Sequence, residues 1–263
     1  MSPLMSAALT ASLAVLIYMT LFWLVSLWRR DASVVDIGWG PAFVLVAWIY
    51  RAHGPEMDIH HLVLLVLVTV WGLRLGIYLF VRNWGKGEDR RYAKMRAREP
   101  NVFWWRSLPM IFYLQGVLVL VISAPHWVAQ LEPGRPGWGY WEVIGVALWL
   151  IGFAFEAGGD WQLARFKANP DNRGKVMDTG FWRYTRHPNY FGDCLQWWAF
   201  YIIALDTPHG WMTLPAPILM TFFLLKVSGV SLLEKDIGER RPAYRDYIER
   251  TPAFVPWFPK SKH

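Results

Sequence analysis

A dense group of polar side chains stands directly before a long apolar run in residues 180–193. The sequence of this stretch is GFWRYTRHPNYFGD, and it contains Arg183, Arg186, His187, Asn189 and Asp193. Polar groups at a membrane boundary are costly unless they bind each other or a ligand. The stretch therefore predicts a binding site at a membrane surface.

Cations suited to a polyphosphate occur at the same ends of the apolar segments. They are Arg82, Lys86, Arg90, Arg91, Lys167, Lys175, Arg183, Arg186 and Arg240, with Asp160, Asn189, Asp193 and Glu234 interspersed among them. Guanidinium and ammonium groups bind phosphate oxygens, and carboxylates or amides suit ribose and amide groups. The set predicts an anionic cofactor.

Several common motifs are absent from the sequence. No GxGxxG stretch follows a strand, no Walker motif occurs, and neither Gly-x-Ser-x-Gly nor HExxH is present. The single Cys194 excludes an internal disulfide and a Cys-based zinc site. The remaining chemistry is oxidation, reduction or group transfer from a cofactor, without a metal.

Asp36 is a second candidate, because it lies inside the apolar sequence VVDI and directly before the break GWGP. A carboxyl group there is costly unless it is paired, protonated or facing a wet cavity. Asp36 either caps the helix that Pro41 starts or belongs to a site, and the two roles are compatible.

Trp71, Arg74 and Tyr78 follow at helical spacing on one face of an apolar segment. An arginine inside a membrane span is a candidate for a functional site. Alternatively, Arg74 reaches the interface near Arg82 along its apolar stem.

Two polar segments are expected to be loops. Residues 51–61, RAHGPEMDIHH, contain three histidines without the spacing of a metal-binding helix, which favours a solvated loop over a metal site. Residues 82–100, RNWGKGEDRRYAKMRAREP, form a charged loop that is either solvated or supplies phosphate contacts.

The elements that must position these residues are membrane helices. The chain has 263 residues, of which 54% are hydrophobic and only 18% charged, and its mean hydropathy is +0.20. Roughly 17 to 25 apolar residues cross the hydrocarbon as a helix, and several stretches reach that length. We predict an all-α polytopic membrane protein with a single transmembrane domain over residues 1–263.

About seven spans are expected, at residues 7–28, 42–50, 62–81, 107–131, 141–155, 190–205 and 212–233. The first is longer than the core of a signal peptide, so we interpret it as retained. On the fourth, Gln115 is expected to hydrogen-bond a neighbouring helix. The helix of the fifth continues past the membrane and carries Glu156 and Asp160 one turn apart.

The net charge of +7 comes from basic residues in short loops and in the amphipathic tail, residues 234–260. This pattern is typical of cytoplasmic loops and argues against nucleic-acid binding. An odd number of spans then places the N-terminus outside, and the candidate cofactor site and the C-terminus in the cytoplasm.

The stretch RYTRHPNYFGD and the sequence SLLEKDIGERRPAYRDYIERTPAFVPWFP resemble the membrane steroid 5-alpha-reductase superfamily and its bacterial relatives. With DIGWGPAF, WGLRLGIY and EDRRY, the similarity covers most of the chain. The resemblance implies seven transmembrane helices in the bacterial inner membrane, and we expect a monomer. It also implies NADPH entering from the cytoplasm and a steroid or similar lipid enone entering from the membrane.

In that superfamily, hydride goes to the β carbon of a 3-oxo-4-ene substrate while an acid hydrogen-bonds the ketone. An acidic residue on the second helix and a tyrosine on the next helix form the acid pair. Asp36 occupies about the acidic position, and Trp71 stands where the tyrosine is expected. The candidates for the proton donor are therefore Asp36, Tyr78 and Trp71, with Asp36 first.

The resemblance places Asp160, Lys167, Lys175, Asn189 and Asp193 at positions that hold NADPH. Asn189 and Asp193 suit the nicotinamide amide, whereas Lys175 and Arg186 suit phosphates. The full expected set is Arg82, Asn83, Asp160, Lys167, Lys175, Arg183, Arg186, His187, Asn189, Asp193, Glu234, Arg240, Tyr244 and Tyr247.

Two alternatives stay open. Isoprenylcysteine and phospholipid methyltransferases resemble the same C-terminal pattern, and in that case Arg186, His187 and Glu234 would hold S-adenosylmethionine. Asp36, Arg74 and the EDRRY stretch favour the reductase, because the methyl donor has no polyphosphate. The third possibility is a lipid-binding or scaffold protein whose polar network is purely structural.

Overall fold

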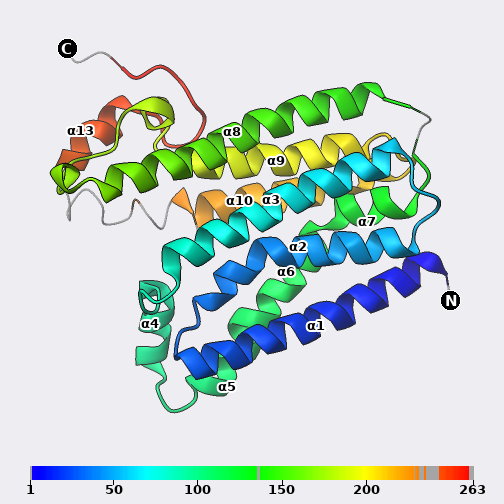
Figure 1. Ribbon diagram of the computed structural model, residues 1–263, viewed down its shortest axis with the longest axis horizontal. Coiled ribbons are helices and arrows are strands. Elements are labelled where there is room, and N and C mark those ends of the chain that lie inside the picture. The colour runs from blue at the N-terminus through cyan, green and yellow to red at the C-terminus, as the bar shows by residue number, and fades with distance from the viewer. Residues whose placement is uncertain (1, 135–136, 228, 231–233, 235–242, 261–263) are drawn as a thin grey trace. The chain divides into compact units, whose positions relative to one another are not determined.

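The computed structural model describes residues 2–134, 137–227, 229–230, 234 and 243–260, and these residues form helices without a strand (Figure 1). Within this part of the chain, six helical segments are long and apolar enough to cross a membrane. They cover residues 3–29, 34–53, 59–83, 103–122, 140–168 and 210–227. The prediction of an all-α membrane protein is confirmed. The sixth predicted span is α9, Pro188–Ala204, with 17 residues.

Residue contacts divide the chain into two compact units. Unit 1 comprises residues 1–139 and 204–213, and unit 2 comprises residues 140–203 and 214–263. The expectation of one transmembrane domain over the whole chain stays a prediction.

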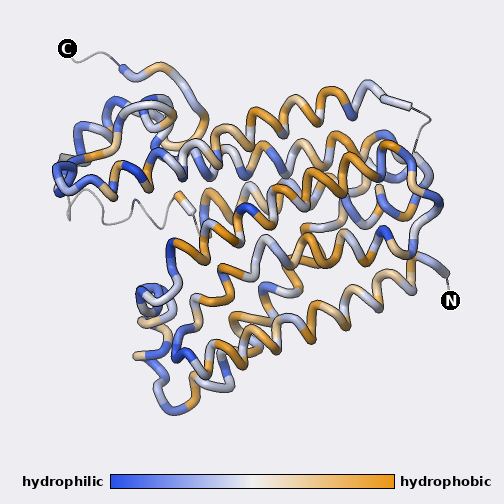
Figure 2. The backbone as a smooth tube through the Cα atoms, viewed as in Figure 1, coloured by the Kyte–Doolittle hydropathy of each residue, from blue (hydrophilic) through white to orange (hydrophobic). Residues whose placement is uncertain are grey.

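Unit 1 is built around α1, α2 and α3. Its elements are α1 (Pro3–Arg29), α2 (Val34–His53), α3 (Ile59–Asn83), α4 (Arg90–Arg98), α5 (Phe103–Ser107), the π-helical η1 (Leu108–Tyr113), α6 (Leu114–Ile122), α7 (Ala124–Leu131) and η4 (Gly210–Thr213). One face of α1 is buried through Ala7, Ala11 and Val15, whereas Leu9 and Leu13 are exposed. Exposed leucines are expected where a helix meets lipid, and Figure 2 shows apolar residues along the long helices and polar ones at their ends.

Two glycines let α2 and α3 approach closely. A Cβ atom added to Gly40 would lie 2.5 Å from the carbonyl oxygen of Gly72. Close beside them, Phe43 and Trp71 are fully buried, with their ring centroids 5.7 Å apart. This contact fixes the part of α2 that follows Asp36.

Unit 2 consists mainly of α8 and α9. Its elements are α8 (Tyr140–Ala168), η2 (Pro170–Asn172), η3 (Gly180–Arg183), α9, α10 (Pro215–Phe222), the π-helical η5 (Phe223–Val227) and α13 (Ala243–Arg250). The predicted extension of the fifth helix is confirmed, because α8 runs on to Ala168. A buried hydrogen bond of 2.6 Å from Gln196 Nε2 to Glu156 Oε2 joins α9 to α8.

The structure corrects four local expectations. α2 begins at Val34 and runs through Pro41, so Asp36 lies inside its first turn and does not cap a helix that starts at Pro41. The expected charged loop contains the nine-residue helix α4. The fourth span is divided, because its helices pass through η1 and are interrupted at Ser123.

The fourth correction concerns the histidine-rich segment. His60 and His61 are fully buried in the first turn of α3, where a solvated loop was expected. His61 lies 2.7 Å from Asp58, the N-cap residue of α3, and completes a capping box with it. Residues 54–58 do lie between helices, and the capping of α3 by Asp58 explains why the two histidines that follow are helical.

Candidate functional site

Asp36 is the centre of a polar cluster in unit 1, which we call the Asp36 cluster: Asp36, Arg91, Tyr92 and Gln115. The Tyr92 hydroxyl donates a hydrogen bond of 2.8 Å to Asp36 Oδ1. Arg91 Nη2 donates to Asp36 Oδ2, also at 2.8 Å. The carboxylate, whose side chain is 22% exposed, thus has one donor on each oxygen, which offsets the cost of placing it in an apolar helix.

The helix that supplies both donors is held against the start of α2 by a second set of bonds. Glu88 accepts from the backbone N–H of Ala32 at 2.8 Å and from two nitrogens of Arg96 at 2.8 and 2.9 Å. The backbone N–H of Asp89 donates to Ser33 Oγ at 3.2 Å. Asp89 also caps α4 by accepting from the Arg91 N–H. These bonds fix α4, and with it Tyr92, beside Asp36.

Tyr92 keeps its proton in this environment. The residue is buried, and burial together with the Asp36 charge raises the pKa of its hydroxyl above the ordinary value. Gln115 Nε2 donates to the Tyr92 oxygen at 3.3 Å, so the glutamine predicted to bond a neighbour contacts α4. A neutral phenol can donate a hydrogen bond to a carbonyl oxygen.

Arg91 keeps its charge. Burial alone would lower the pKa of its guanidinium, but attraction to Asp36 and the bond to Asp89 outweigh burial and raise it. Arg91 Nε lies 2.9 Å from Asp89 Oδ1. The Asp36 cluster therefore combines a carboxylate, a fixed cation and a protonated phenol.

The proton donors expected on α3 occupy other surroundings. Trp71 is fully buried against Phe43. The Tyr78 ring lies under the guanidinium groups of Arg74 and Arg82, at 5.1 and 5.4 Å. Their roles stay predictions. The sequence analysis did not single out Tyr92, because the EDRRY stretch that contains it was interpreted as part of a loop that is either solvated or supplies phosphate contacts.

A second cluster lies in unit 2, and we call it the Glu234 triad: Arg186, His187 and Glu234. Arg186 Nε and Nη2 donate to the two oxygens of Glu234 at 2.7 and 2.8 Å. His187 Nε2 lies 3.0 Å from Glu234 Oε1. Burial would raise the pKa of Glu234, but the hydrogen bonds from His187 and Arg186 outweigh it and lower the pKa to about 2.

Arg186 has little capacity left for a phosphate. Its Nη1 also donates to the carbonyl oxygens of Ile248, at 2.9 Å, and Thr251. Four of its five N–H groups are thereby used within the protein. The Glu234 triad thus ties the segment before α9 to the C-terminal tail.

The tail folds back onto unit 2, as expected for an amphipathic segment. The buried Tyr247 hydroxyl donates to the carbonyl oxygen of Trp182, and Tyr244 lies 5.2 Å from Tyr247 by ring centroid. Thr185 Oγ1 donates to the carbonyl oxygen of Phe254 at 2.8 Å. Tyr247 is thus an anchor of α13 in the structure.

Asn189 and Asp160 are brought together in unit 2. Asn189 Nδ2 donates to Asp160 Oδ1 at 3.1 Å, and Asp160 is almost completely buried. Asp193 lies one turn further along α9 and is also buried. The Asn189 side-chain carbonyl and the carboxylate oxygens are the kinds of group that recognise an amide or a ribose.

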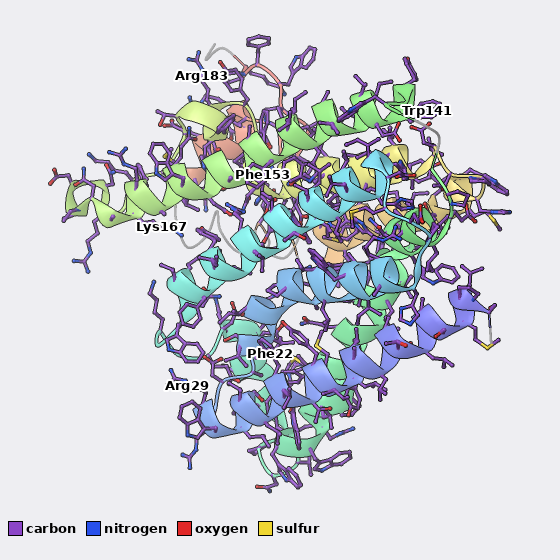
Figure 3. All side chains as sticks on the ribbon, turned by 45° about the vertical axis from the view of Figure 1, so that its right-hand side comes forward. Phe22, Arg29, Trp141, Phe153, Lys167 and Arg183 are labelled. Atoms are coloured by element: carbon purple, nitrogen blue, oxygen red, sulfur yellow. The ribbon has the colours of Figure 1, made fainter. Side chains whose placement is uncertain are left out.

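Exposed cations suited to phosphates surround these residues along the chain. Lys167 lies near the end of α8 and Arg183 in η3 (Figure 3), and Lys175 lies between η2 and η3. In unit 1, Arg82 Nε donates to Asn83 Oδ1 at 2.9 Å, and both are at the exposed end of α3. Arg240 lies outside the described residues. These side chains are of the types that bind phosphates, amides and ribose, and their role in holding a cofactor stays a prediction.

The comparisons with known proteins support one family. The uncharacterized protein C594.04c of Schizosaccharomyces pombe (strain 972) is 27% identical over 264 residues, which cover 89% of this chain and 75% of that protein. No solved structure matches the chain significantly. Residues 22–251 match the family described as "Protein of unknown function (DUF1295)". The chain belongs to the DUF1295 family.

Proposed function

We propose that this protein is an NADPH-dependent reductase of the 4,5 double bond of 3-oxo-4-ene steroids or similar lipid enones. The observation that carries the proposal is the hydrogen bond from Tyr92 to Asp36 in a chain built of membrane-crossing helices. A tyrosine beside a carboxylate is the acid pair that the resemblance to the steroid 5-alpha-reductase superfamily implies. In this chain, Tyr92 on α4 would be the tyrosine of the acid pair, which the resemblance had placed on α3.

Reduction of an enone needs a proton donor at the ketone oxygen, because negative charge develops there. Tyr92 supplies that donor when the ketone oxygen replaces Asp36 as the acceptor of its hydroxyl. Asp36 keeps its bond to Arg91, while Gln115 donates to the phenol oxygen. Addition of hydride to the β carbon would leave an enolate, whose oxygen accepts the hydrogen bond of Tyr92, and the proton that ends on the α carbon would come from water. Tyr92 thus keeps its own proton, and its hydroxyl can bond Asp36 again after the product leaves.

NADPH, when bound, supplies the hydride that forms the new C–H bond at the β carbon of the substrate. In unit 2, Lys167, Lys175 and Arg183 would bind its phosphates, and Asp160, Asn189 and Asp193 would recognise its amide and ribose groups. Arg82 and Asn83 are further candidates in unit 1. Arg186, His187 and Glu234 would hold the α9 end in place, because their polar atoms bond each other.

The cellular setting follows from the same resemblance. An apolar substrate dissolves in the membrane and reaches a helical bundle from the lipid. The protein would lie in the bacterial inner membrane as a monomer, with its N-terminus outside and its C-terminus in the cytoplasm.

The proposal is tested with detergent-purified full-length protein, NADPH and a 3-oxo-4-ene steroid, with the 4,5-reduced product measured by mass spectrometry. We expect Tyr92→Phe to lower turnover by roughly 100-fold or more, the usual size of a lost general acid. Tyr140→Phe is the control, because Tyr140 is 72% exposed. Wild-type turnover in Tyr92→Phe, or no product with any 3-oxo-4-ene tested, would contradict the proposal.

A further inference from the structure

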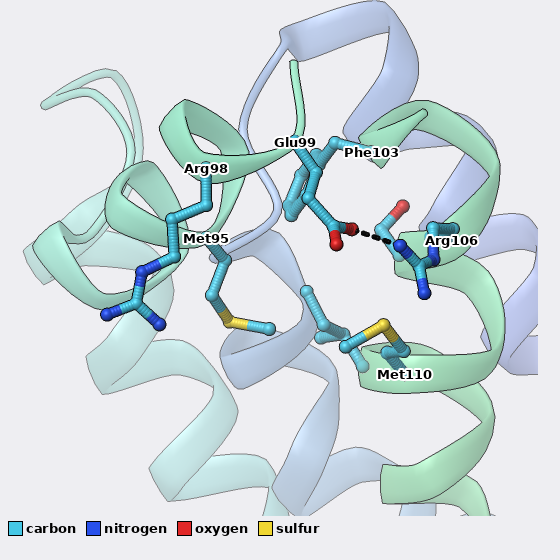
Figure 4. A pocket seen from close by; sticks show the side chains of 8 residues that line it. Met95, Arg98, Glu99, Phe103, Arg106 and Met110 are labelled. Carbon is cyan, nitrogen blue, oxygen red and sulfur yellow. Dashed lines mark hydrogen bonds and ion pairs between the residues drawn. The ribbon is translucent and has the colours of Figure 1, made fainter. Parts of the chain in front are cut away.

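A cavity of about 170 Å³ lies in unit 1, at the charged end of the fourth apolar segment (Figure 4). It is formed by α4, α5 and η1. Its lining consists of Met95, Arg98, Glu99, Phe103, Arg106, Ser107, Met110 and Ile111. The Asp36 cluster does not contribute to this lining.

The polar part of the lining carries a net positive charge. Arg106 Nη1 lies 2.6 Å from Glu99 Oε2, so these two charges offset each other. Arg98 is exposed and has no ion-pair partner among the residues that the structure describes. In Figure 4, its side chain runs alongside Met95, while the Glu99–Arg106 pair lies toward the other side of the cavity. Arg98 is thus available to an anion.

The rest of the lining is apolar. Phe103 and Ile111 are buried, and the Met110 side chain is exposed to 48%. Trp104 and Trp105, which follow Phe103 in the chain, are 54% and 48% exposed. Exposed tryptophans beside arginines mark the level of lipid headgroups. The cavity therefore offers an anion-binding rim and an apolar wall at the membrane surface.

The size of the cavity limits its ligand. Pockets that enclose a whole drug-sized molecule have volumes of roughly 300–1,000 Å³, and this one is smaller. It suits a phosphate with a short polar group, while an attached acyl chain would remain in the surrounding membrane, next to Met110. Arginine is well adapted to a phosphate because of its forked donors.

We propose that this cavity binds the phosphate headgroup of an anionic phospholipid, with Arg98 as the principal cation. A neutral, zwitterionic headgroup carries its own ammonium group, which Arg98 would repel, because Glu99 offsets the charge of Arg106 and not that of Arg98. The proposal is independent of the reductase activity, since it concerns only lipid binding.

The test is native mass spectrometry of the detergent-purified full chain with added lipid. The probes are phosphatidylglycerol, phosphatidylcholine and, as a soluble phosphate ester, glycerol 3-phosphate. The variant is Arg98→Glu, and the matched control is Lys94→Glu, which makes the same charge change at an exposed position on α4 outside the cavity. Circular dichroism confirms that both variants are folded.

We expect phosphatidylglycerol to bind the wild type more tightly than phosphatidylcholine. Arg98→Glu should weaken phosphatidylglycerol binding by roughly tenfold, because one attraction becomes a repulsion, and Lys94→Glu by about twofold or less. Equal losses in both variants would overturn the cavity as the site. Equal binding of the two lipids, or displacement of phosphatidylglycerol by an equal concentration of glycerol 3-phosphate, would overturn the anionic lipid as its ligand.

Discussion

Each oxygen of the Asp36 carboxylate has its own donor, and the two donors have different chemical roles. Arg91 stays charged and fixes the carboxylate, whereas Tyr92 carries a proton that can be shared with another acceptor. In the proposed reaction, adjacent residues of α4 would thus have separate roles. The effects of removing them should therefore differ.

Replacing Arg91 by Met should mainly lower stability. It leaves the half-buried Asp36 without its ion partner, and loss of one partner of such a pair costs about 1–3 kcal/mol. The Arg91 side chain is 38% exposed, so solvent screens part of its interaction with Asp36. We therefore expect the free energy of unfolding to fall by about 1 kcal/mol, the lower end of that range. The measurement is the unfolding midpoint in detergent by tryptophan fluorescence. The control is the exposed neighbour Arg90→Met, and equal midpoints for the two variants would contradict the role of Arg91.

Glu234 should make stability depend on pH in the acid range. Its folded-state pKa of about 2 lies below its ordinary value of 4.5. The stabilisation is therefore complete above about pH 4.5 and is lost as the pH falls toward 2. The difference corresponds to about 3 kcal/mol at most.

This is measured by unfolding midpoints between neutral pH and about pH 3 for the wild type and Glu234→Gln. The variant should be less stable at neutral pH and should lose less stability on acidification. If the midpoints of the wild type and Glu234→Gln fell in parallel with pH, the Glu234 triad would not be the source of the pH-dependent stabilisation.

At the scale of elements, the contact between α2 and α3 depends on two glycines facing each other. A Cβ atom at Gly72 would lie 2.6 Å from the carbonyl oxygen of Gly40, which is too close for either helix to stay in place. Overpacking of this kind costs about 1–3 kcal/mol. Gly72→Ala should therefore lower the thermal midpoint, whereas Leu73→Val, at the exposed neighbouring position, should change it little. No difference between the two variants would contradict the packing argument.

The elements also show what the sequence could and could not predict. A membrane span is a run of consecutive apolar residues and can be recognised directly in the sequence. The predicted bounds of α1, α3 and α8 are therefore close to those in the structure. The start of α2 was missed because Gly38, Gly40 and Pro41 normally break helices. In this fold, Gly40 permits the close approach to α3, and Gly38 leaves room for the ring of Phe22 on α1.

Tyr92 was missed for a different reason. It lies 56 residues from Asp36 in the chain, and no periodicity joins positions that far apart. The charged segment around it predicted a loop, since the bonds that hold α4 in place, from Ala32 to Glu88 and from Asp89 to Ser33, are tertiary. By contrast, the bond between Arg186 and Glu234 joins two residues that the charge pattern had already singled out.

At the scale of the whole molecule, the identity of the cofactor can be decided by what stabilises the intact chain. A ligand that binds only the folded state stabilises it by about 2.7 kcal/mol at 100 times its dissociation constant. We expect NADPH to raise the thermal midpoint of the purified protein and S-adenosylmethionine to leave it unchanged. Asn189→Ala should reduce the shift caused by NADPH, because the bond between Asn189 and Asp160 organises the expected amide-binding groups.

The matched comparison is Asp36→Asn, which changes unit 1 and should retain the NADPH shift while losing turnover. The ligand-induced shift, and not the starting midpoint, is the quantity to compare, since both substitutions also alter stability directly. Stabilisation by S-adenosylmethionine alone would favour the methyltransferase and contradict the reductase. If neither NADPH nor S-adenosylmethionine changed the thermal midpoint, a structural role for the polar clusters would be favoured. A ligand that binds the folded state at saturating concentration must raise that midpoint.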